Sequence, residues 1–478
     1  MSSTAQLSAR ERIISLLDDN SFVEVGAFVT KRSTDFNLQQ KDTPADGVIT
    51  GYGVIDGNLV YVYSQDAASM GGSIGEMHAK KIANIYDLAL KVGAPVIGLI
   101  DSTGLRLQEA TDALNGFGEV YLKSTLASGV IPQITAIFGN CGGGLAVLAS
   151  LSDFSFMEGK DAKLFVNSPN ALTGNRKEKC DTAQAAFQGK AGVVDYVGGD
   201  EADVLNQIRN LITILPSNNE DDASFDECTD DLNRLLPGLQ AEVNDSKKAL
   251  IDISDNNYFF EIKAGYAKEM VTGFIRLNGM TIGAVANRSE IADDAGKVTE
   301  RFDGTLTTAG CYKAESFVRI CDAFGIPVVT LTNVNGYKAT VEEEKGIAIA
   351  SAKLTYAFAN ATVPKVNVII GKAFGTAYVT MNSKHIGADM VFALPSAQIG
   401  MMDSTLAAQI MYEGEALEVQ KEKAAEYAAL QSSAEAAARR GYVDSIIEPD
   451  SVRKHLIYTF EMLFTKRETR PAKKHGTI

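Results

Sequence analysis

The chain has 478 residues, and its 60 acidic and 45 basic side chains give a formal net charge of −15. This charge opposes binding to nucleic acid or to anionic lipid, so both functions are disfavoured. The sequence has no apolar run of about 18 residues or more and no basic-then-apolar start, which predicts neither a membrane span nor a secretory signal. Five cysteines without a CxxC pair and four scattered histidines predict no disulfide framework and no metal site, and they favour a cytoplasmic protein.

The first predicted elements follow one another closely. Ser8 starts an expected helix that ends near residue 18, with Glu11 at the spacing of a capping box. Alternating residues rich in Val, Ile and Tyr over 47–63 predict a hairpin with Asp56-Gly57 at its turn. A helix, a short apolar strand covered on both faces and another helix are expected next, over residues 75–91, 95–100 and 112–127.

The second half repeats this order of elements. A hairpin over 270–285 with Asn278-Gly279 at its turn precedes a predicted helix, strand and helix over residues 312–323, 327–331 and 342–359. Residues 293–310 are polar and glycine-rich and have no match in the first half. The Ala- and Glu-rich stretch 416–440 predicts a helix of the kind that packs domains or subunits together.

Three pairs of residues share one offset of 232 between the halves. They are Pro95 and Pro327 (327 − 95), Pro132 and Pro364 (364 − 132), and Gly139 and Gly371 (371 − 139). A constant offset predicts two copies of one fold, with domains at 1–230 and 231–478 and an acidic, weakly patterned linker at 218–231. Because strands and helices alternate, each copy is expected to be a layered α/β unit with a mainly parallel sheet.

Two glycine-rich turns carry the chemistry expected of this chain. The first runs from Gly139 to Gly144 and the second from Gly371 to Ala377, and each follows a buried strand and is expected to start a helix. Glycine permits unusual backbone angles, and two free N–H groups at a helix start that face one oxygen form an oxyanion hole. The pattern alone leaves a tight turn with close helix packing equally open, and its duplication favours the functional interpretation.

Other chemistry has weaker support. No GxGxxG or GxxxxGK[ST] follows a first strand, so dinucleotide and P-loop functions lack a motif. His385 lies near the second turn, where a structural or solvent-facing imidazole is favoured over a base. Asp101 and Arg106 are interpreted as ion-pair or cap residues that order their loop. A phosphate-bearing ligand needs a local basic patch, and the tail from Lys466 to His475 is either that patch or a solvated terminus.

Several motifs together resemble a known family. Ser64-Gln65-Asp66 followed by Gly71-Gly72-Ser73, the stretches 93–99 and 128–133, and the stretch 356–366 are close to its characteristic segments. On these residues the chain resembles the carboxyltransferase subunits of biotin-dependent acyl-CoA carboxylases, transcarboxylases and decarboxylases. Propionyl-CoA carboxylase β subunits are the most similar type, and the resemblance runs nearly from end to end.

The resemblance implies a fold, an assembly and partners. The fold is a tandem duplication of the ClpP/crotonase-like α/β fold, with acyl-CoA bound mainly by the first domain and biotin by the second. Biotin is expected on a separate carrier protein, since this chain has no Met-Lys-Met step. A homo-oligomer, commonly a hexamer, is implied, together with biotin carboxylase or membrane decarboxylase subunits and without nucleic acid.

The same resemblance implies the site residue by residue. The catalytic amides fall on Gly143 and Gly144 in the first turn and on Gly375, Thr376 and Ala377 in the second. Residues that bind the cofactor or the coenzyme A thioester fall on Gly71, Gly72, Ser73, Gly104, Gly336 and Tyr337, and none falls on a metal ligand. Thr376 stands where the family has glycine, and further departures occur at 101–105, 333–337 and 349–353.

Several functions remain open from the sequence. The first is carboxyl transfer between N1′ of biotin and the α-carbon of a short acyl-CoA, with amides holding both developing oxyanions and biotin taking the α-proton. The same site run backwards makes a decarboxylase α subunit equally consistent. A crotonase-like hydratase or isomerase without biotin is disfavoured, because no paired acid and base lies near the first turn. The departures in the second half motivate a fourth possibility, a homologue that binds CoA without catalysis.

Overall fold

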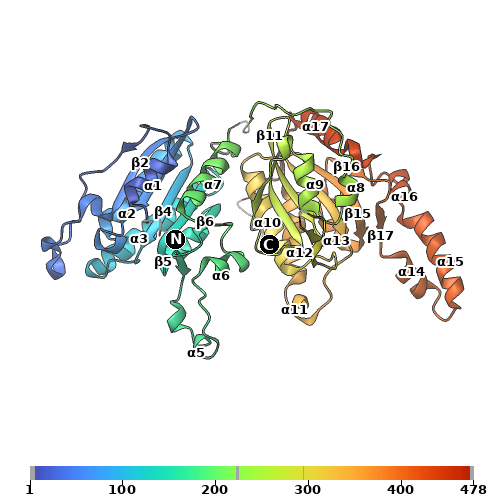
Figure 1. Ribbon diagram of the computed structural model, residues 1–478, viewed down its shortest axis with the longest axis horizontal. Coiled ribbons are helices and arrows are strands. Elements are labelled where there is room, and N and C mark those ends of the chain that lie inside the picture. The colour runs from blue at the N-terminus through green and yellow to red at the C-terminus, as the bar shows by residue number, and fades with distance from the viewer. Residues whose placement is uncertain (1–5, 222–224, 294, 474–478) are drawn as a thin grey trace. The chain divides into compact units, whose positions relative to one another are not determined.

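The computed structural model describes residues 6–221, 225–293 and 295–473, and the chain divides into two compact units, Met1–Ser224 and Phe225–Ile478 (Figure 1). The border lies six residues before the expected one (230 − 224). Each unit encloses a hydrophobic core of its own, in which one face of its sheet packs against helices. No described helix is long and apolar enough to cross a lipid bilayer.

The first unit is built on one eight-stranded sheet with the order β1-β2-β3-β4-β5-β6-β8, and β7 pairs with the carboxyl end of β5. β2 and β3 form the antiparallel hairpin predicted around Asp56-Gly57, and from β3 onwards each strand pairs with its neighbour in parallel. The strands are β1 (Val23–Glu24), β2 (Val48–Ile55), β3 (Asn58–Gln65), β4 (Val96–Ser102), β5 (Gln133–Gly142), β6 (Phe154–Glu158), β7 (Lys163–Phe165) and β8 (Tyr196–Gly198).

Helices cover the first sheet and begin with the predicted capping box. The Ser8 hydroxyl accepts the N–H of Glu11, and the Glu11 carboxylate accepts the N–H of Ser8. The helix before β4 ends at Gly93, whose φ of 67° is the left-handed C-cap that glycine adopts without strain. The helices are α1 (Ala9–Leu16), α2 (Glu76–Val92), α3 (Ala110–Ala127), α4 (Gly144–Leu151), α5 (Asn175–Glu178), α6 (Ala185–Lys190) and α7 (Glu201–Ile214).

The second unit repeats this sheet, with the order β18-β16-β15-β14-β11-β10-β9 and with β17 paired to the carboxyl end of β15. A separate two-stranded sheet, β12 (Glu290–Ala292) with β13 (Val298–Arg301), flanks and enters the first part of the segment that had no match in the first half. The other strands are β9 (Phe260–Ile262), β10 (Met270–Leu277), β11 (Met280–Asn287), β14 (Val328–Val334), β15 (Lys365–Phe374), β16 (Met390–Ala393), β17 (Gln398–Gly400) and β18 (Ser445–Ile446).

Two helices predicted in the second half are broken in the structure. Gly346, whose φ of −140° is not helical, separates α11 (Val341–Glu344) from α12 (Ile347–Asn360), and the Glu343 carboxylate in α11 accepts the N–H of Thr308 at 2.7 Å. The predicted helix over 416–440 becomes α15 (Leu417–Tyr427), a π-helical turn and α16 (Ala434–Arg439), since Ser433 pairs with Gln398 of β17. The remaining helices are α8 (Leu239–Glu242), α9 (Ser246–Ile253), α10 (Thr308–Ala323), α13 (Gly375–Thr380), α14 (Ser404–Met411) and α17 (Val452–Leu463).

The two sheets share one strand register, which confirms the predicted duplication. In each unit the two central parallel strands pair at positions that differ by 232 residues, and both ladders are interrupted at equivalent points. The equivalent pairs are Val96 with Gln133 and Val328 with Lys365, and the interruptions fall at Ile100/Ser102 and Thr332/Val334. Each interruption bends the strand just before its glycine-rich turn, so both turns leave their sheets in the same way.

Candidate active site: two glycine-rich turns

The first turn joins β5 to α4 through Gly143, whose φ of 61° and ψ of −124° are conformations that side-chain-bearing residues avoid. The N–H of Gly143 donates to the carbonyl of Phe165 in β7 at 2.9 Å. One member of the expected amide pair Gly143 and Gly144 is therefore already bonded to the sheet. Gly143 supplies the bend, and the N–H groups that follow it remain for a ligand.

Gly144 and Leu145 occupy the first two positions of α4, where an N–H group has no acceptor within the helix. No side chain caps this helix start. A side chain on Gly144 would lie 2.9 Å from the Tyr121 hydroxyl and 3.0 Å from the Phe117 ring, so only glycine fits. The Tyr121 hydroxyl donates to the Gly144 carbonyl at 2.6 Å and fixes the orientation of the peptide whose N–H belongs to Leu145. The tight turn with close helix packing is therefore present, and the oxyanion interpretation stays a prediction.

The second turn repeats this arrangement between β15 and α13. Gly375 has a φ of 65°, and Thr376 and Ala377 follow within the first turn of the helix, again without a side-chain cap. Thr376 does not have a positive φ, and its side chain is exposed, so the β-branched residue keeps its N–H in a helical position without a clash. The departure from glycine at this position is therefore compatible with the same backbone geometry.

The other expected site residues form a loop pair beside each turn. In the first unit the Thr103 N–H donates to the Gly71 carbonyl at 3.0 Å, and the Ile74 N–H donates to the Gly104 carbonyl at 2.8 Å. A side chain on Gly72 would lie 2.3 Å from the Asp101 carbonyl, so this glycine is required by close backbone contact. The structure thus brings Gly71, Gly72, Ser73 and Gly104 together beside the strand that precedes the turn.

The second unit contains the equivalent loop pair, one member of which the sequence analysis missed. The Asn335 N–H donates to the Gly304 carbonyl at 2.7 Å, and the Leu306 N–H donates to the Gly336 carbonyl at 2.8 Å. Residues 303–306 are therefore the counterpart of 71–74, although the whole segment 293–310 was expected to lack one. The signal available in the sequence was the glycine at position 304, which adopts a φ of 71° in the structure. The Tyr337 hydroxyl lies 3.2 Å from that of Thr380 on α13, which ties this loop to the second turn.

Ion pairs hold the first loop pair in place. Arg106 is completely buried, pairs with Asp46 at 2.7 Å and with Glu109 at 2.8 Å, and donates to the Ser73 carbonyl at 2.8 Å. Burial raises the pKa of Asp46 although the Arg106 guanidinium lies beside it. Asp101 pairs with Arg12 at 3.3 Å. The interpretation of Asp101 and Arg106 as loop-ordering ions is confirmed, with partners that are distant in the sequence.

His385 packs as an aromatic ring beside the second unit's turn. Its ring lies 5.9 Å from that of Tyr378 and 4.8 Å from that of Tyr442, both edge to face. This packing agrees with a structural imidazole. In the described part of the chain, no three His, Cys, Asp or Glu side chains are grouped to hold a metal ion.

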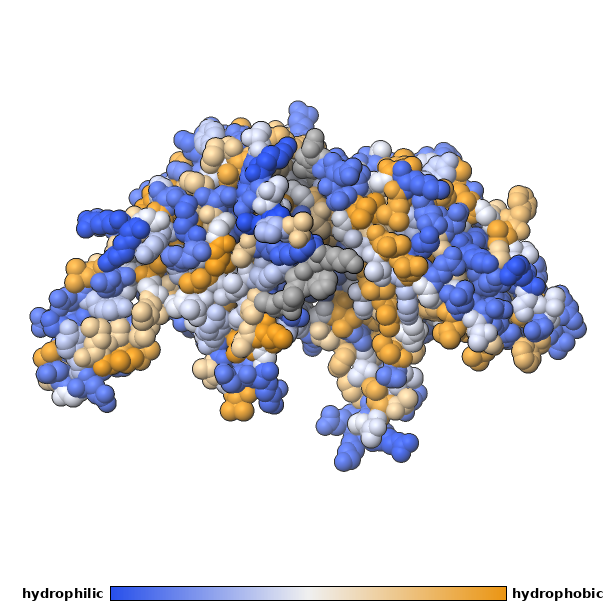
Figure 2. Space-filling model, turned by 180° about the vertical axis from the view of Figure 1, so that it is seen from behind, coloured by the Kyte–Doolittle hydropathy of each residue, from blue (hydrophilic) through white to orange (hydrophobic). Residues whose placement is uncertain are grey.

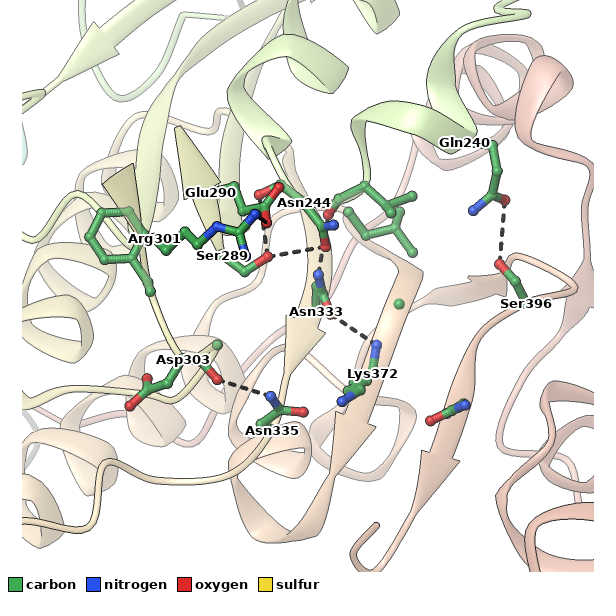
Figure 3. A pocket seen from close by; sticks show the side chains of 16 residues that line it. Gln240, Asn244, Ser289, Glu290, Arg301, Asp303, Asn333, Asn335, Lys372 and Ser396 are labelled. Atoms are coloured by element: carbon green, nitrogen blue, oxygen red, sulfur yellow. Dashed lines mark hydrogen bonds and ion pairs between the residues drawn. The ribbon is translucent and has the colours of Figure 1, made fainter. Parts of the chain in front are cut away.

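A polar cavity of about 480 Å³ lies at the carboxyl ends of β14 and β15 (Figure 3). Asn333 crosses its floor: its side-chain oxygen accepts the N–H of Lys372 at 3.0 Å, and its side-chain nitrogen donates to the Val243 carbonyl at 3.2 Å. Asn335 donates to the Asp303 carbonyl at 2.9 Å. The departures at Asn333 and Asn335 therefore border this cavity, whereas the residues that bear the uncapped amides do not line it. Sequence reasoning did not predict the cavity.

Comparison with known proteins gives a consistent result. Residues 2–478 match the family described as "Carboxyl transferase domain". The chain is 39% identical to the methylmalonyl-CoA decarboxylase subunit alpha of Propionigenium modestum, over 99% of this chain and 93% of that protein. It is 41% identical to the mitochondrial propionyl-CoA carboxylase beta chain of Homo sapiens, over 99% and 88%. The crystal structure of transcarboxylase 12S, described as a hexamer with hydrolysed methylmalonyl-coenzyme A bound, matches with a TM-score of 0.92 at 36% identity, over 99% of this chain and 92% of that one.

Proposed function

The chain belongs to the carboxyl transferase domain family, and from that premise we propose that it moves a carboxyl group between biotin on a separate carrier protein and the α-carbon of a short acyl-CoA. The resemblance and the duplicated crotonase-like fold predicted from the sequence are confirmed by the end-to-end family match and by the agreement with transcarboxylase 12S. The protein is an enzyme of the biotin-dependent carboxyltransferase class.

The observation that carries the mechanism is the pair of uncapped helix starts. In the first unit the Gly144 and Leu145 N–H groups lie at the positive end of α4 and would hold the thioester oxygen, where charge develops as the enolate forms. Preorganised donors of this kind are effective because they need no reorganisation during reaction. Removal of one typically lowers the rate about 10²- to 10³-fold.

The second helix start has the donor set that a ureido oxygen requires. The Thr376 and Ala377 N–H groups would hold the carbonyl oxygen of the biotin ring and stabilise the charge that develops there. Biotin, when bound, supplies the nitrogen that carries CO₂ and that accepts the α-proton. The chain itself therefore has to bind, orient and exclude water, and it needs no side-chain base.

The two units take separate roles in this proposal. The first, over 1–230 in the sequence analysis, binds acyl-CoA beside Gly71, Gly72, Ser73 and Gly104. The second, over 231–478, binds biotin beside Gly336 and Tyr337. The support is geometric, since each of these residues lies in the loop pair that adjoins its own turn.

The direction of transfer remains open within the proposal. Relatives of nearly equal identity are named for both directions, a methylmalonyl-CoA decarboxylase subunit alpha at 39% and a propionyl-CoA carboxylase beta chain at 41%. Oxyanion donors serve both directions, because the same enolate forms when CO₂ leaves or arrives. The two corresponding partner sets are biotin carboxylase and membrane decarboxylase subunits, each with a biotin carrier protein. A cytoplasmic homo-oligomer, commonly a hexamer as described for transcarboxylase 12S, completes the proposal.

A glycine pair tests the mechanism. Gly143→Ala places a side chain at a φ of 61°, and Gly325→Ala does so at a φ of 68° in the loop before β14; neither added carbon meets another atom within 4 Å. Transfer from methylmalonyl-CoA or malonyl-CoA to free biotin is expected to fall about 100-fold in Gly143→Ala, because a side chain at this strained bend displaces the Gly144 and Leu145 N–H donors that follow it, and to be unchanged in Gly325→Ala. Full activity of folded Gly143→Ala would exclude the first turn as the reaction centre.

A further inference from the structure

The polar cavity of the second unit has a smaller counterpart at the same place in the first unit. Their volumes are about 480 Å³ and about 210 Å³, and Asn244 lines the larger one where Leu7 lines the smaller one (244 − 7 = 237). The same offset relates Asp255 to Asp18 (255 − 18), and both carboxylates accept the N–H groups of their own hairpin turn. The two cavities can therefore be compared residue by residue.

A buried cation that packs beside the smaller cavity is missing in the second unit. Arg12 is buried, pairs with Glu201 at 2.9 Å and lies 4.8 Å over the ring of Phe138, and both of these partners line the smaller cavity. Ala249 replaces Arg12 (249 − 12 = 237), and Ile370 replaces Phe138 (370 − 138 = 232). Both replacements shorten the side chain, so the second unit has room for a ligand where the first unit has a filled wall.

The charged side chains that line the larger cavity leave one cation without a partner. Glu290 pairs with Arg301 at 3.5 Å. Asp303 pairs with Lys338 at 2.5 Å. The ammonium group of Lys372 forms neither an ion pair nor a hydrogen bond within residues 6–221, 225–293 and 295–473, and only its backbone N–H is bonded, to Asn333. In a chain with a net charge of −15, this unpaired cation makes the cavity a local site for an anion.

Two amide side chains add hydrogen-bond donors to the same cavity. The Ser289 hydroxyl donates to the side-chain oxygen of Asn244 at 3.1 Å (Figure 3). The Ser396 hydroxyl donates in the same way to the side-chain oxygen of Gln240 at 3.3 Å. Because both amide oxygens are occupied, the amide nitrogens of Asn244 and Gln240 remain, and neither donates to another group among the described residues. Together with Lys372 they offer donors to an acceptor-rich ligand.

Other parts of the second unit are poorer candidates for an anion site. Residues 399–432 carry a net charge of −4 (2 basic, 6 acidic), and the surface of α14 and α15 within them mixes apolar and hydrophilic side chains (Figure 2). In the tail, Lys466 pairs with Asp389 at 2.8 Å and with Glu468 at 3.0 Å. Arg470 pairs with Glu468 at 2.7 Å, and residues 474–478 lie outside the described part of the chain. These paired cations of the tail are neutralised within the protein.

We propose that the larger cavity binds a small organic carboxylate, whose charge Lys372 neutralises and whose oxygens accept the amide N–H groups of Asn244 and Gln240. Hydrogen bonds from an ammonium group to a carboxylate are among the stronger ones in proteins. The volume of about 480 Å³ lies in the range of sites for organic ligands and exceeds what an inorganic anion fills. The site goes beyond the proposed function, because the residues that bear the uncapped amides of either turn do not line it.

The test compares two probes that share one carbon skeleton and differ in charge. Calorimetric titration of the full-length protein should show binding of malonate and none of malonamide. Lys372→Asn installs the residue of the first unit, Asn140 (372 − 140 = 232), and should weaken malonate binding about tenfold. Asn244→Leu installs the equivalent of Leu7 and should weaken it about fivefold. Lys421→Asn is the matched control and should bind as wild type, since this exposed lysine of the second unit does not line the cavity.

Several results would overturn the proposal. They are a wild-type protein that does not bind malonate, equal binding of malonamide or of inorganic phosphate, and equal affinity for malonate in wild type and folded Lys372→Asn. Circular dichroism establishes that each variant is folded, and both substitutions introduce residues that the first unit accommodates at the same position.

A competition measurement separates this site from the proposed reaction centre, because malonate also resembles the acyl group of a substrate. The titration with malonate is repeated with saturating malonyl-CoA and without biotin, so that no acceptor for the carboxyl group is present. The affinity for malonate should be unchanged, and its loss would place malonate at the acyl site and overturn the proposal. Binding of malonate in a protein that transfers no carboxyl group would keep the cavity site and reject the proposed function.

Discussion

The loops that support the two turns have the same backbone and are held by different side chains. Arg106 and Lys338 occupy equivalent positions (338 − 106 = 232), and the N–H of each donates to its partner loop, at 2.9 Å to Ile74 and at 2.9 Å to Leu306. The Arg106 side chain is 0% exposed between two carboxylates, whereas the Lys338 side chain is 37% exposed and, among the residues that the structure describes, forms an ion pair with Asp303 alone.

This difference shows how one duplicated loop can be rigid in one copy and adaptable in the other. A buried guanidinium is stable only while its hydrogen bonds are all made, so the loop around Arg106 has a single favourable arrangement. An exposed lysine loses little when it moves, because water replaces its partner. We infer that the loop around Arg106 in the first unit is preorganised and that the loop around Lys338 in the second unit tolerates movement.

Removal of the buried guanidinium should have the largest effect on stability. Arg106→Met leaves Asp46 and Glu109 buried without a cation, and the free energy of unfolding should fall by about 3–5 kcal/mol. Lys338→Met should lower it by less than about 1 kcal/mol, since that ion pair is exposed. Urea unfolding of both variants provides the measurement. Similar losses of unfolding free energy in the two variants would show that both loops are held equally strongly, which would contradict the inferred difference between them.

The hydroxyl of Tyr121 should contribute to catalysis by orienting the first turn, and it should have no counterpart at the second turn. Tyr121→Phe removes the donor to the Gly144 carbonyl and frees the peptide that carries the Leu145 N–H, so kcat should fall about tenfold with KM unchanged. The equivalent residue in the second unit is Lys353 (353 − 121 = 232), which lies over the Tyr312 ring. Lys353→Met is the control and should leave kcat unchanged. A fall in stability without a kcat effect would assign Tyr121 a packing role only.

Local signals in the sequence were sufficient to predict much of the fold. The Asp56-Gly57 and Asn278-Gly279 turns were predicted from residue type, because both need a positive φ that these residues adopt readily. The structure adds that Asp18 accepts both N–H groups of the first turn and Asp255 both of the second, at 2.8–3.2 Å. The register of the repeat was predictable for the same reason, since prolines and glycines mark fixed backbone geometry.

The candidate site was predicted less well, because its details depend on contacts distant in the sequence. The Gly143 N–H is occupied by Phe165, 22 residues further along (165 − 143), and no glycine pattern contains that pairing. The helix predicted over 342–359 breaks at Gly346, whose φ of −140° lies outside the helical region, and residue type alone did not indicate this break. Arg106 was correctly expected to order its loop, but its partner Asp46 lies in a segment that carried no signal.

A pair of equivalent aspartates gives the smallest expected effect and the most specific test of the difference between the two units. Asp153 and Asp389 each accept a strand N–H at 2.8 Å, from Gln133 and from Lys365, but only Asp389 has a cationic partner in the described part of the chain, Lys466 at 2.8 Å. Desolvation raises the pKa of Asp153 from 3.8 to about 7. The folded state therefore binds this proton more tightly than the unfolded state, and the contribution of Asp153 to stability falls as the pH rises from about 4 to about 7.

Substitution by asparagine should consequently have opposite effects in the two units. Asp153→Asn keeps an acceptor for Gln133 and removes the charge, so at pH 8 it should raise the free energy of unfolding by about 1 kcal/mol, with the gain disappearing near pH 4. Asp389→Asn should lower it by about 1 kcal/mol at pH 8, because Lys466 loses one of its two carboxylate partners in a largely buried position and keeps only Glu468. Urea titrations at both pH values measure each change. Loss of stability in both variants at pH 8 would mean that Asp153 is stabilised as an anion, and that the two units treat this position alike.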